Sequence, residues 1–204
     1  MIAELERAAG RPVSRGTLER LEAYAALLRR ESATQNLVSA STLDRLWDRH
    51  ILDSVQLVRF QPDPRASWLD IGSGAGLPGI AIACLAAGPV TLVEPRRLRV
   101  EFLHKVVATL DLRVEIVRGR AERLEGKFAT ITARAVAPLP KLLELSHHLS
   151  TRNSRWVLPK GRNAQSELAA AQRAWQGAFH VEQSLTDADS YIIVATDVKP
   201  RRKS

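Results

Sequence analysis

Cysteine is nearly absent from this 204-residue sequence, which contains only Cys84. One thiol cannot build an intramolecular disulfide framework or a cluster of thiolate metal ligands, and such scarcity fits a reducing compartment. Long apolar runs are also absent, because the run over residues 77–90 is short and is broken by proline and glycine. The charges within residues 4–7 leave no apolar core for a signal peptide. We therefore expect a cytoplasmic protein without a membrane partner.

Acidic residues are in the minority, since 22 Asp and Glu face 30 Lys and Arg and leave a net charge of +8. This balance favours a polyanionic partner over a neutral metabolite, although a basic surface can also serve solubility alone. The 45% hydrophobic and 25% charged residues are typical of globular proteins. A chain of this length suffices for one domain with a sizeable core.

The order of patterns along the chain predicts helices first and a sheet afterwards. Ser14 is placed to cap a helix that runs to about Arg30, and Ser41, three residues before an acid, is placed to start a second one towards Arg59. Prolines at 62 and 64 then end the helical part. We expect residues 1–60 to form a helical extension packed on one compact core of residues 61–204. In that core we predict seven strands, at 67–71, 90–94, 114–117, 128–133, 155–158, 180–185 and 191–198, and helices at 77–87, 96–110, 138–148 and 163–175.

The most informative stretch is Asp70–Gly79, where an apolar strand ends in an acid and breaks into alternating glycines. Strand, glycine turn and helix are how an open α/β sheet holds an adenine-containing cofactor. The glycines are Gly72, Gly74 and Gly76, whereas a dinucleotide fingerprint needs its third glycine where Leu77 stands. A dehydrogenase is therefore disfavoured.

Glu94 ends the second predicted strand, at the place where a carboxylate accepts hydrogen bonds from ribose hydroxyls. The alternative is that the glycines only form a turn and that Glu94 is an ordinary surface acid. The two features together favour the cofactor site.

This combination of an acid-x-Gly-x-Gly-x-Gly turn, an acid closing the second strand and a terminal hairpin resembles class I S-adenosylmethionine-dependent methyltransferases. Five segments narrow the resemblance to the bacterial 16S rRNA (guanine-N7)-methyltransferase G family, also known as glucose-inhibited division protein B. It implies an α/β Rossmann-like fold with a seven-stranded, mostly parallel sheet. One departure is Ala133, where the family usually has serine. The segments are Asn36–Ser39, Arg49–Ser54, Asp70–Ile80, Ala133–Ala135 and Leu158–Gly161.

The resemblance implies S-adenosylmethionine as the cofactor and assigns residues to it. Backbone around Gly72 and Leu77 would face the methionine end of the cofactor, and Ala121 and Glu122, after the third strand, would read the adenine. Acids are also favoured in a first helical turn, so Glu122 can equally be a solvated helix start. The cofactor-binding residues are expected to be Gly72, Gly74, Gly76, Leu77, Glu94, Ala121, Glu122 and Arg134.

Arg134 ends the fourth strand, where methyl donor and acceptor must meet. The resemblance implies contact with the methionine carboxylate or the incoming nucleotide, and the alternative is a strand-end ion pair. Lys160 and Arg162 flank the same rim and are candidates for holding RNA phosphates. We assign Arg49–Asp53, which includes His50, to anchoring the N-terminal helices on the sheet and give it no chemistry.

Some catalytic devices are missing from the sequence. Methylation of an exocyclic amine in this fold typically uses an Asn/Asp-Pro-Pro-aromatic turn after the fourth strand, and residues 133–138 do not contain it. Methylation of a pyrimidine carbon needs a cysteine nucleophile, but Cys84 lies in an apolar helix and is expected to be a small buried hydrophobe. No metal-ligand cluster is visible, since His147 and His148 are adjacent and face different sides of a helix.

Guanine N7 fits these absences, because its in-plane lone pair attacks an electrophilic methyl group without prior deprotonation. Catalysis then rests on proximity and orientation, so we expect neither a catalytic acid or base nor a metal ligand. The predicted function is methyl transfer to N7 of a guanine in 16S rRNA, by a monomer, on the small ribosomal subunit or an assembly intermediate. The alternatives are a class I methyltransferase acting on another RNA, a small molecule or a protein, and a non-catalytic RNA-binding or assembly factor. The basic run at 199–203 is a further candidate for phosphate contact.

Overall fold

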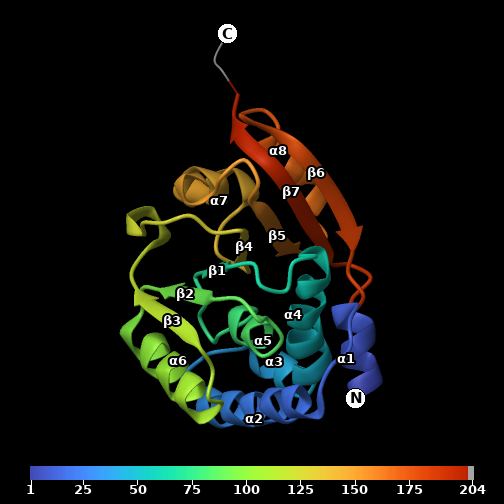
Figure 1. Cartoon of the computed structure of the whole chain (residues 1–204), viewed down its shortest axis with the longest axis vertical. Helices are drawn as coiled ribbons and strands as arrows, with labels where there is room; N and C mark the ends of the chain where they lie inside the picture. The colour runs from blue at the N-terminus through green and yellow to red at the C-terminus, as the bar shows by residue number, and fades with distance from the viewer. Residues whose placement is uncertain (202–204) are drawn as a thin grey trace.

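A seven-stranded sheet runs through the protein in the order β3-β2-β1-β4-β5-β7-β6 (Figure 1). The structure is a computed structural model that describes residues 1–201, apart from the side chains of Ala40 and Thr42, so the last residues of the basic run lie outside it. The first five strands pair in parallel, and β7 runs antiparallel to both β5 and β6. The predicted fold class is therefore confirmed. The strands are β1 (Trp68–Ile71), β2 (Val90–Glu94), β3 (Val114–Arg118), β4 (Thr130–Ala133), β5 (Arg155–Lys160), β6 (Trp175–Gln183) and β7 (Tyr191–Pro200).

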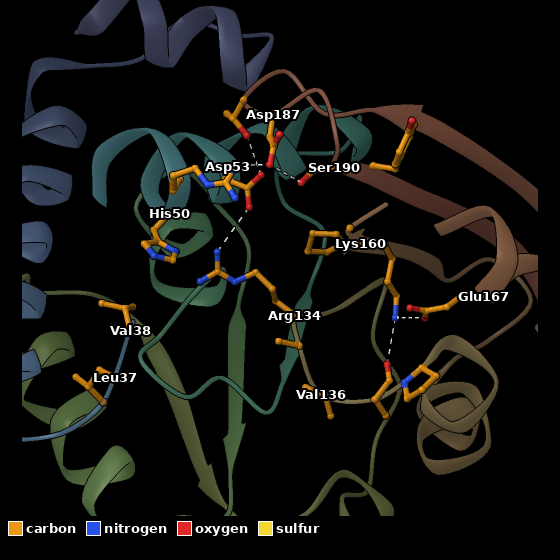
Figure 2. A pocket seen from close by; sticks show the side chains of 18 residues that line it. Leu37, Val38, His50, Asp53, Arg134, Val136, Lys160, Glu167, Asp187 and Ser190 are labelled. Atoms are coloured by element: carbon orange, nitrogen blue, oxygen red, sulfur yellow. Dashed lines mark hydrogen bonds and ion pairs between the residues drawn. The ribbon is translucent and has the colours of Figure 1, made fainter. Parts of the chain in front are cut away.

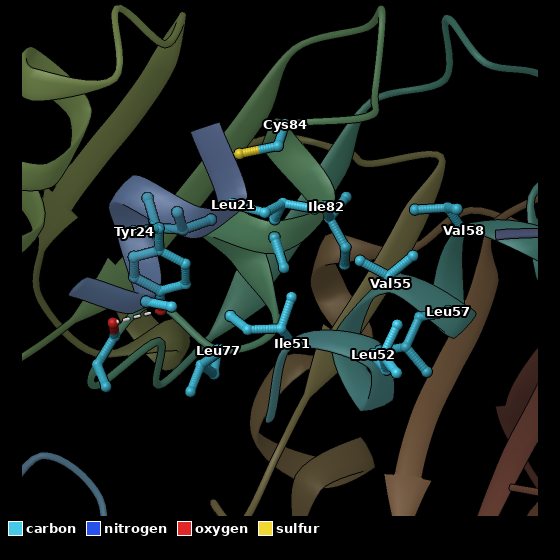
Figure 3. Close-up of a cluster of buried hydrophobic side chains, with 14 of the residues drawn as sticks. Leu21, Tyr24, Ile51, Leu52, Val55, Leu57, Val58, Leu77, Ile82 and Cys84 are labelled. Carbon is cyan, nitrogen blue, oxygen red and sulfur yellow. Dashed lines mark hydrogen bonds between the residues drawn. The ribbon is translucent and has the colours of Figure 1, made fainter. Parts of the chain in front are cut away.

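Helices cover both faces of the sheet, and β1, β2 and β4 are consequently buried along their whole length. The larger buried cluster joins the N-terminal helices to α5 and α6, and a second cluster lies under α7 and α8. Leu21 and Tyr24 of α2 lie beside Ile82 of α5 and beside Cys84, which directly follows α5 (Figure 3). The helices are α1 (Ile2–Ala9), α2 (Arg15–Ser32), α3 (Ala40–Leu43), α4 (Asp53–Val55), α5 (Gly79–Ala83), α6 (Arg97–Thr109), α7 (Leu139–Ser146) and α8 (Ala164–Ala171).

Cys84 is a free, buried thiol, as expected from its apolar surroundings, and burial raises its pKa to about 12. Within the described part of the chain no helix is both long enough and apolar enough to cross a bilayer.

The N-terminal helices confirm one predicted cap and contradict the other. The Oγ of Ser14 accepts the N–H of Thr17 at 3.1 Å and starts α2. Ser41 instead lies inside α3, and the single helix predicted from it is wrong. The chain turns after α3, forms a π-helix η1 (Trp47–Leu52), continues through α4 and ends in a 3-10 helix η2 (Gln56–Phe60).

Apolar spacing explains the π-helix. Leu46 and Ile51 are both completely buried although they are five residues apart. An α-helix would turn one of them away from the core, whereas a π turn, with bonds from i to i+5, places them on one face.

The helix after the glycine turn is also shorter than predicted. The predicted helix over 77–87 is reduced to α5, because the N–H groups of Ala87 and Gly88 donate to the carbonyl oxygen of Pro64 at 2.9 and 3.1 Å. These bonds draw the chain towards the loop before β1. Two further 3-10 turns, η3 (Ala121–Arg123) and η4 (His147–Leu149), follow β3 and α7.

Candidate functional site

The site lies at the carboxyl edge of the sheet, between the neighbouring strands β1 and β4. Ile71 pairs with Ala133, so Gly72 and Arg134 follow at adjacent positions although they are far apart in the sequence. The strand order β3-β2-β1-β4-β5 changes direction here, because the chain builds outward from β1 to β3 and then returns to β4. Ligands of open α/β sheets bind at such a switch point.

The glycine loop has a backbone that only glycine adopts readily. Gly72 has a φ of +66°, and a Cβ there would lie 2.6 Å from Cγ2 of Val136. Gly76 has a φ of +91°, and a Cβ there would lie 2.5 Å from Cγ1 of Ile80. Both positions combine left-handed backbone with close neighbours, so any side chain would distort the loop. The hydroxyl of Tyr24 donates to the carbonyl oxygen of Ala75 at 2.7 Å and ties α2 to this loop.

Glu94, which is predicted to accept ribose hydroxyls, is brought against the glycine loop, a contact that the sequence did not reveal. Its side chain is only 3% exposed. One carboxylate oxygen accepts the N–H of Gly74 at 2.8 Å, and the other accepts the N–H of Arg96 at 2.9 Å. The carboxylate therefore fixes the loop. Each oxygen keeps a further lone pair for a ligand hydroxyl, so contact with a ribose stays a prediction.

Asp70 lies beneath the same loop and is completely enclosed. Its Oδ2 accepts the N–H of Gly79 at 3.1 Å, and its Oδ1 has no hydrogen-bond partner within the described residues. Burial raises the pKa of this carboxyl to about 7, with smaller opposing effects from its hydrogen bonds and from Arg134. Asp70 thus connects β1 to the start of α5.

The predicted adenine-reading residues follow β3 at the same edge. The N–H of Gly119 donates to the carbonyl oxygen of Glu94 at 3.2 Å, which places the loop after β3 beside the end of β2. Ala121 is buried in the second core cluster, and Glu122 is exposed. A ligand at Ala121 would therefore meet its backbone.

Arg134 is held by the N-terminal segment. Its Nη1 lies 3.6 Å from Oδ2 of Asp53, and both side chains are about one-fifth exposed. Oδ1 of Asp53 accepts hydrogen bonds from Thr186 Oγ1 and Gln56 Nε2, each at 2.9 Å. Arg49 forms an ion pair with Asp187 in the loop between β6 and β7. Arg49 and Asp53 thus make the anchoring contacts that the sequence predicted.

A cavity of about 660 Å³ opens beside Arg134, and Arg49, His50 and Asp53 line it too. This is the part of the site that the sequence missed. Leu37, Val38 and Val136 form its apolar walls (Figure 2). The volume lies within the range typical of small-molecule sites.

The backbone at Ala135 and the side chain of His50 shape this cavity. Ala135 has a φ of +56°, unusual for a residue other than glycine, and the chain there places Val136 against Gly72. His50 faces the cavity, and burial, together with Arg134 and Arg49, lowers its pKa to about 4. Its imidazole is therefore neutral at pH 7.

Lys160 and Arg162, the predicted phosphate-binding residues, differ in their availability. The ammonium of Lys160 is 2.8 Å from Glu167 Oε2 and donates to the carbonyl oxygen of Ala137 at 3.1 Å, and its side chain is 10% exposed. Arg162 is 80% exposed and lies 3.8 Å from Asp189. Contact with RNA stays a prediction for both, but Lys160 has a structural role that the sequence did not indicate. Residues 1–201, as described, contain no group of His, Cys, Asp or Glu side chains placed to hold a metal ion.

Comparison with known proteins identifies the family. A family model described as rRNA small subunit methyltransferase G matches residues 17–191. A Ribosomal RNA small subunit methyltransferase G of Zymomonas mobilis is 48% identical over 200 residues, which cover 94% of this chain and 90% of the relative. One of Erythrobacter litoralis is 50% identical over 180 residues, which cover 87% of each chain. The chain belongs to the rRNA small subunit methyltransferase G family.

Solved structures support the same fold at lower identity. A SAM-dependent methyltransferase from Aquifex aeolicus matches with a TM-score of 0.63 at 14% identity, over 81% of this chain and 97% of that one. A ribosomal protein L11 methylase from Lactobacillus delbrueckii matches with a TM-score of 0.59 at 14% identity, over 76% and 79% of the two chains. This member of the rRNA small subunit methyltransferase G family is thus an enzyme that uses S-adenosylmethionine.

The geometry of the family member fits this cofactor. The glycine loop follows β1 at the carboxyl edge of the sheet, and Glu94 and the loop after β3 line the same edge. These are the parts of an open α/β sheet that hold an adenosine group.

Proposed function

We propose that this enzyme transfers a methyl group from S-adenosylmethionine to N7 of a guanine in 16S rRNA. The supporting observation is that every carboxylate lining the 660 Å³ cavity is paired with a cation of the same cavity. Asp53 pairs with Arg134, Glu167 with Lys160 and Asp187 with Arg49. A carboxylate that is engaged by a cation is a poor proton acceptor. An acceptor that needs no deprotonation is therefore the best match.

His50 is a further candidate base in the cavity. With a pKa of about 4 its imidazole is neutral but only weakly basic at pH 7. The names of the relatives specify small-subunit rRNA. Guanine N7 has a free lone pair at neutral pH, so it needs no base, and it is present in small-subunit rRNA.

The cofactor is proposed to lie along the glycine loop. When bound, S-adenosylmethionine supplies an electrophilic methyl group on a sulfonium centre. Backbone at Gly72, Gly74, Gly76 and Leu77 would hold its methionine part, with Arg134 beside the methionine carboxylate or the incoming nucleotide. Glu94 would accept the ribose hydroxyls, and the backbone of Ala121 together with Glu122 would read the adenine.

The acceptor guanine is proposed to enter the 660 Å³ cavity. Leu37, Val38 and Val136 offer apolar surface for the faces of the base and exclude water. The carboxylates of Asp53 and Glu167 lie in the same cavity and would help to offset the positive charge that the base gains. Rate enhancement then comes from alignment of acceptor and donor, with no catalytic acid, base or metal.

The proposal extends to the state in which the enzyme acts. We propose a cytoplasmic monomer in which residues 1–60 form a helical extension on the core of residues 61–204. Its substrate would be 16S rRNA within the small subunit or an assembly intermediate.

Product identification tests the proposed function. The protein is incubated with methyl-labelled S-adenosylmethionine and naked 16S rRNA, small subunits, total tRNA or cell-extract protein, and the RNA is then digested to nucleosides. We expect label in 7-methylguanosine from 16S rRNA or small subunits. Label in N1- or N2-methylguanosine, or in tRNA or protein alone, would contradict the proposal. Arg152→Gln serves as the active control, because Arg152 is 84% exposed and lies before β5, at the opposite edge of the sheet.

A further inference from the structure

A second cavity adjoins the first and is lined mainly by charged side chains. It has a volume of about 340 Å³ and is lined by Ser41, Arg45, Arg49, Arg162, Asp187 and Asp189. Arg49 and Asp187 line both cavities, so the two lie side by side. Arg45 and Arg49 come from the segment around η1, whereas Arg162 follows β5. The fold thus gathers guanidinium groups from distant parts of the chain next to the proposed acceptor site.

Aspartates of the β6–β7 loop partly neutralise these arginines. Asp187 pairs with Arg49, and Asp189 Oδ2 lies 3.8 Å from Arg162 Nη2. Within the described part of the chain, no ion pair engages Arg45, which is exposed. The cavity therefore keeps an excess of positive charge.

The two ion pairs differ in strength. Arg49 and Asp187 are 36% and 21% exposed, and Asp187 also accepts from Ser190 Oγ and from the N–H of Asp189, each at 3.0 Å. Arg162 and Asp189 are 80% and 74% exposed. Exposed ion pairs contribute little stabilisation, so an incoming anion can displace Asp189 easily.

We propose that the 340 Å³ cavity binds a backbone phosphate of the RNA, next to the nucleotide whose base enters the larger cavity. Arg45 and Arg162 contact the phosphate, and the less exposed Arg49 adds positive charge to the same cavity. An arginine guanidinium can form bidentate hydrogen bonds with two phosphate oxygens. Because the two cavities share a wall, the base site and the phosphate site are adjacent, as the base and the backbone phosphate of RNA require.

This assignment rests on the proposed function and changes one of its details. The ammonium of Lys160 is already bound to Glu167 and to a backbone oxygen, so it supports the cavity wall. The phosphate contacts belong instead to Arg45 and Arg162, whose exposed side chains have only weak partners or none.

The test compares two exposed arginine–aspartate pairs. Arg162 and Asp189 form the test pair, and Arg152 and Asp197, 3.5 Å apart at the opposite edge of the sheet, form the control pair. Initial rates of methyl transfer to small subunits or 16S rRNA are measured against RNA concentration at several KCl concentrations. Affinity for S-adenosylmethionine is measured in parallel by calorimetry.

For Arg45→Gln and Arg162→Gln we expect the KM for RNA to rise about five- to tenfold, with unchanged affinity for S-adenosylmethionine. The slope of log(kcat/KM) against log[KCl] should become shallower by about 0.7–1 for each arginine. Asp189→Asn should lower the KM for RNA about two- to threefold, because it frees Arg162. Arg152→Gln and Asp197→Asn should leave all three quantities unchanged.

An unchanged KM and salt slope in the Arg45→Gln/Arg162→Gln double variant would overturn the phosphate site. Equal effects in the control pair would overturn it as well, since they would reflect net charge alone. If the unmodified enzyme methylates no RNA but methylates a protein, the proposed function itself fails, and that result is distinct from a loss confined to the variants.

Discussion

Asp53 Oδ2 lies 3.6 Å from Arg134 Nη1, and this ion pair joins the N-terminal segment to the end of β4. The other carboxylate oxygen is held by Thr186 and Gln56, and the N–H of Leu185 in turn donates to Gln56 Oε1 at 2.9 Å. A guanidinium attached in this way has little freedom. Asp53 is therefore a positioning residue for Arg134.

Asp53→Asn should slow methyl transfer by about tenfold, because it removes the charge that orients Arg134 while keeping an acceptor for Thr186. Single-turnover rates and S-adenosylmethionine affinity measure the effect, and Asp53→Glu should recover part of it. Asp48→Asn is the matched control, since Asp48 is exposed on the adjoining π-helix η1. An unchanged rate in Asp53→Asn would show that the ion pair does not serve the reaction.

Gly72→Ala should weaken S-adenosylmethionine binding at least tenfold and lower the free energy of unfolding by about 1–3 kcal/mol. The left-handed φ and the contact with Val136 both oppose a methyl group. Val136→Ala in the same chain relieves the contact but not the backbone strain, so it should restore stability only in part. Gly16→Ala, in the open on α2, should leave binding intact and stabilise the helix slightly. Calorimetry and urea unfolding provide both readouts.

Glu94→Gln should reduce S-adenosylmethionine affinity more than tenfold, because an amide nitrogen cannot accept the N–H of Gly74 or Arg96. A cofactor analogue lacking the ribose 2′-hydroxyl separates the two roles of this carboxylate. If Glu94 also binds the ribose, the variant should discriminate less between the analogue and S-adenosylmethionine than the unmodified enzyme does. If the affinity losses from Glu94→Gln and from removal of the 2′-hydroxyl are additive, Glu94 only fixes the loop and does not bind the ribose.

Asp70→Asn should change how stability depends on pH. Burial raises the pKa of Asp70 from 3.8 to about 7, so its contribution to stability is complete below pH 3.8 and is lost as the pH rises through 7. The stability of the variant relative to the unmodified protein should therefore increase between pH 4 and 7 by a few kcal/mol and stay constant above. Urea unfolding at several pH values measures this. Asp63→Asn, in an exposed turn, serves as the control.

His50 should contribute with the opposite sign. Its pKa is lowered from 6.5 to about 4, so its contribution is present above pH 6.5 and is lost as the pH falls through 4. His50→Gln should therefore lose less stability than the unmodified protein on acidification from pH 6.5 to 4. An identical loss of stability in both proteins would mean that His50 does not contribute to this acid sensitivity.

Local signals account for the parts of the structure that the sequence predicted well. The strand over Val90–Glu94 has the predicted bounds, and Glu94 meets the glycine loop, because strand, turn and acid are all encoded within a short stretch. The predicted helix from Ser41 fails, because periodicity at α-helical pitch cannot reveal a π turn that is set by burial of Leu46 and Ile51.

The walls of the larger cavity could not be predicted in the same way. Val38, Asp53, Val136 and Asp187 belong to four separate segments that meet only in the folded chain. The partner of Lys160 was equally hidden, since charge on a sequence does not tell which lysine is already paired.

The π-helix requires a particular number of residues between Arg45 and Asp53. Removing one residue from Trp47–Leu52 would return the backbone to α-helical pitch and rotate the preceding residues by about 100° about the axis. Arg45 would then turn out of phase with Asp53, and its guanidinium would leave the cavity shared with Arg49. A one-residue deletion here should therefore be far more damaging than most substitutions, and an insertion or deletion would be tolerated only outside this turn.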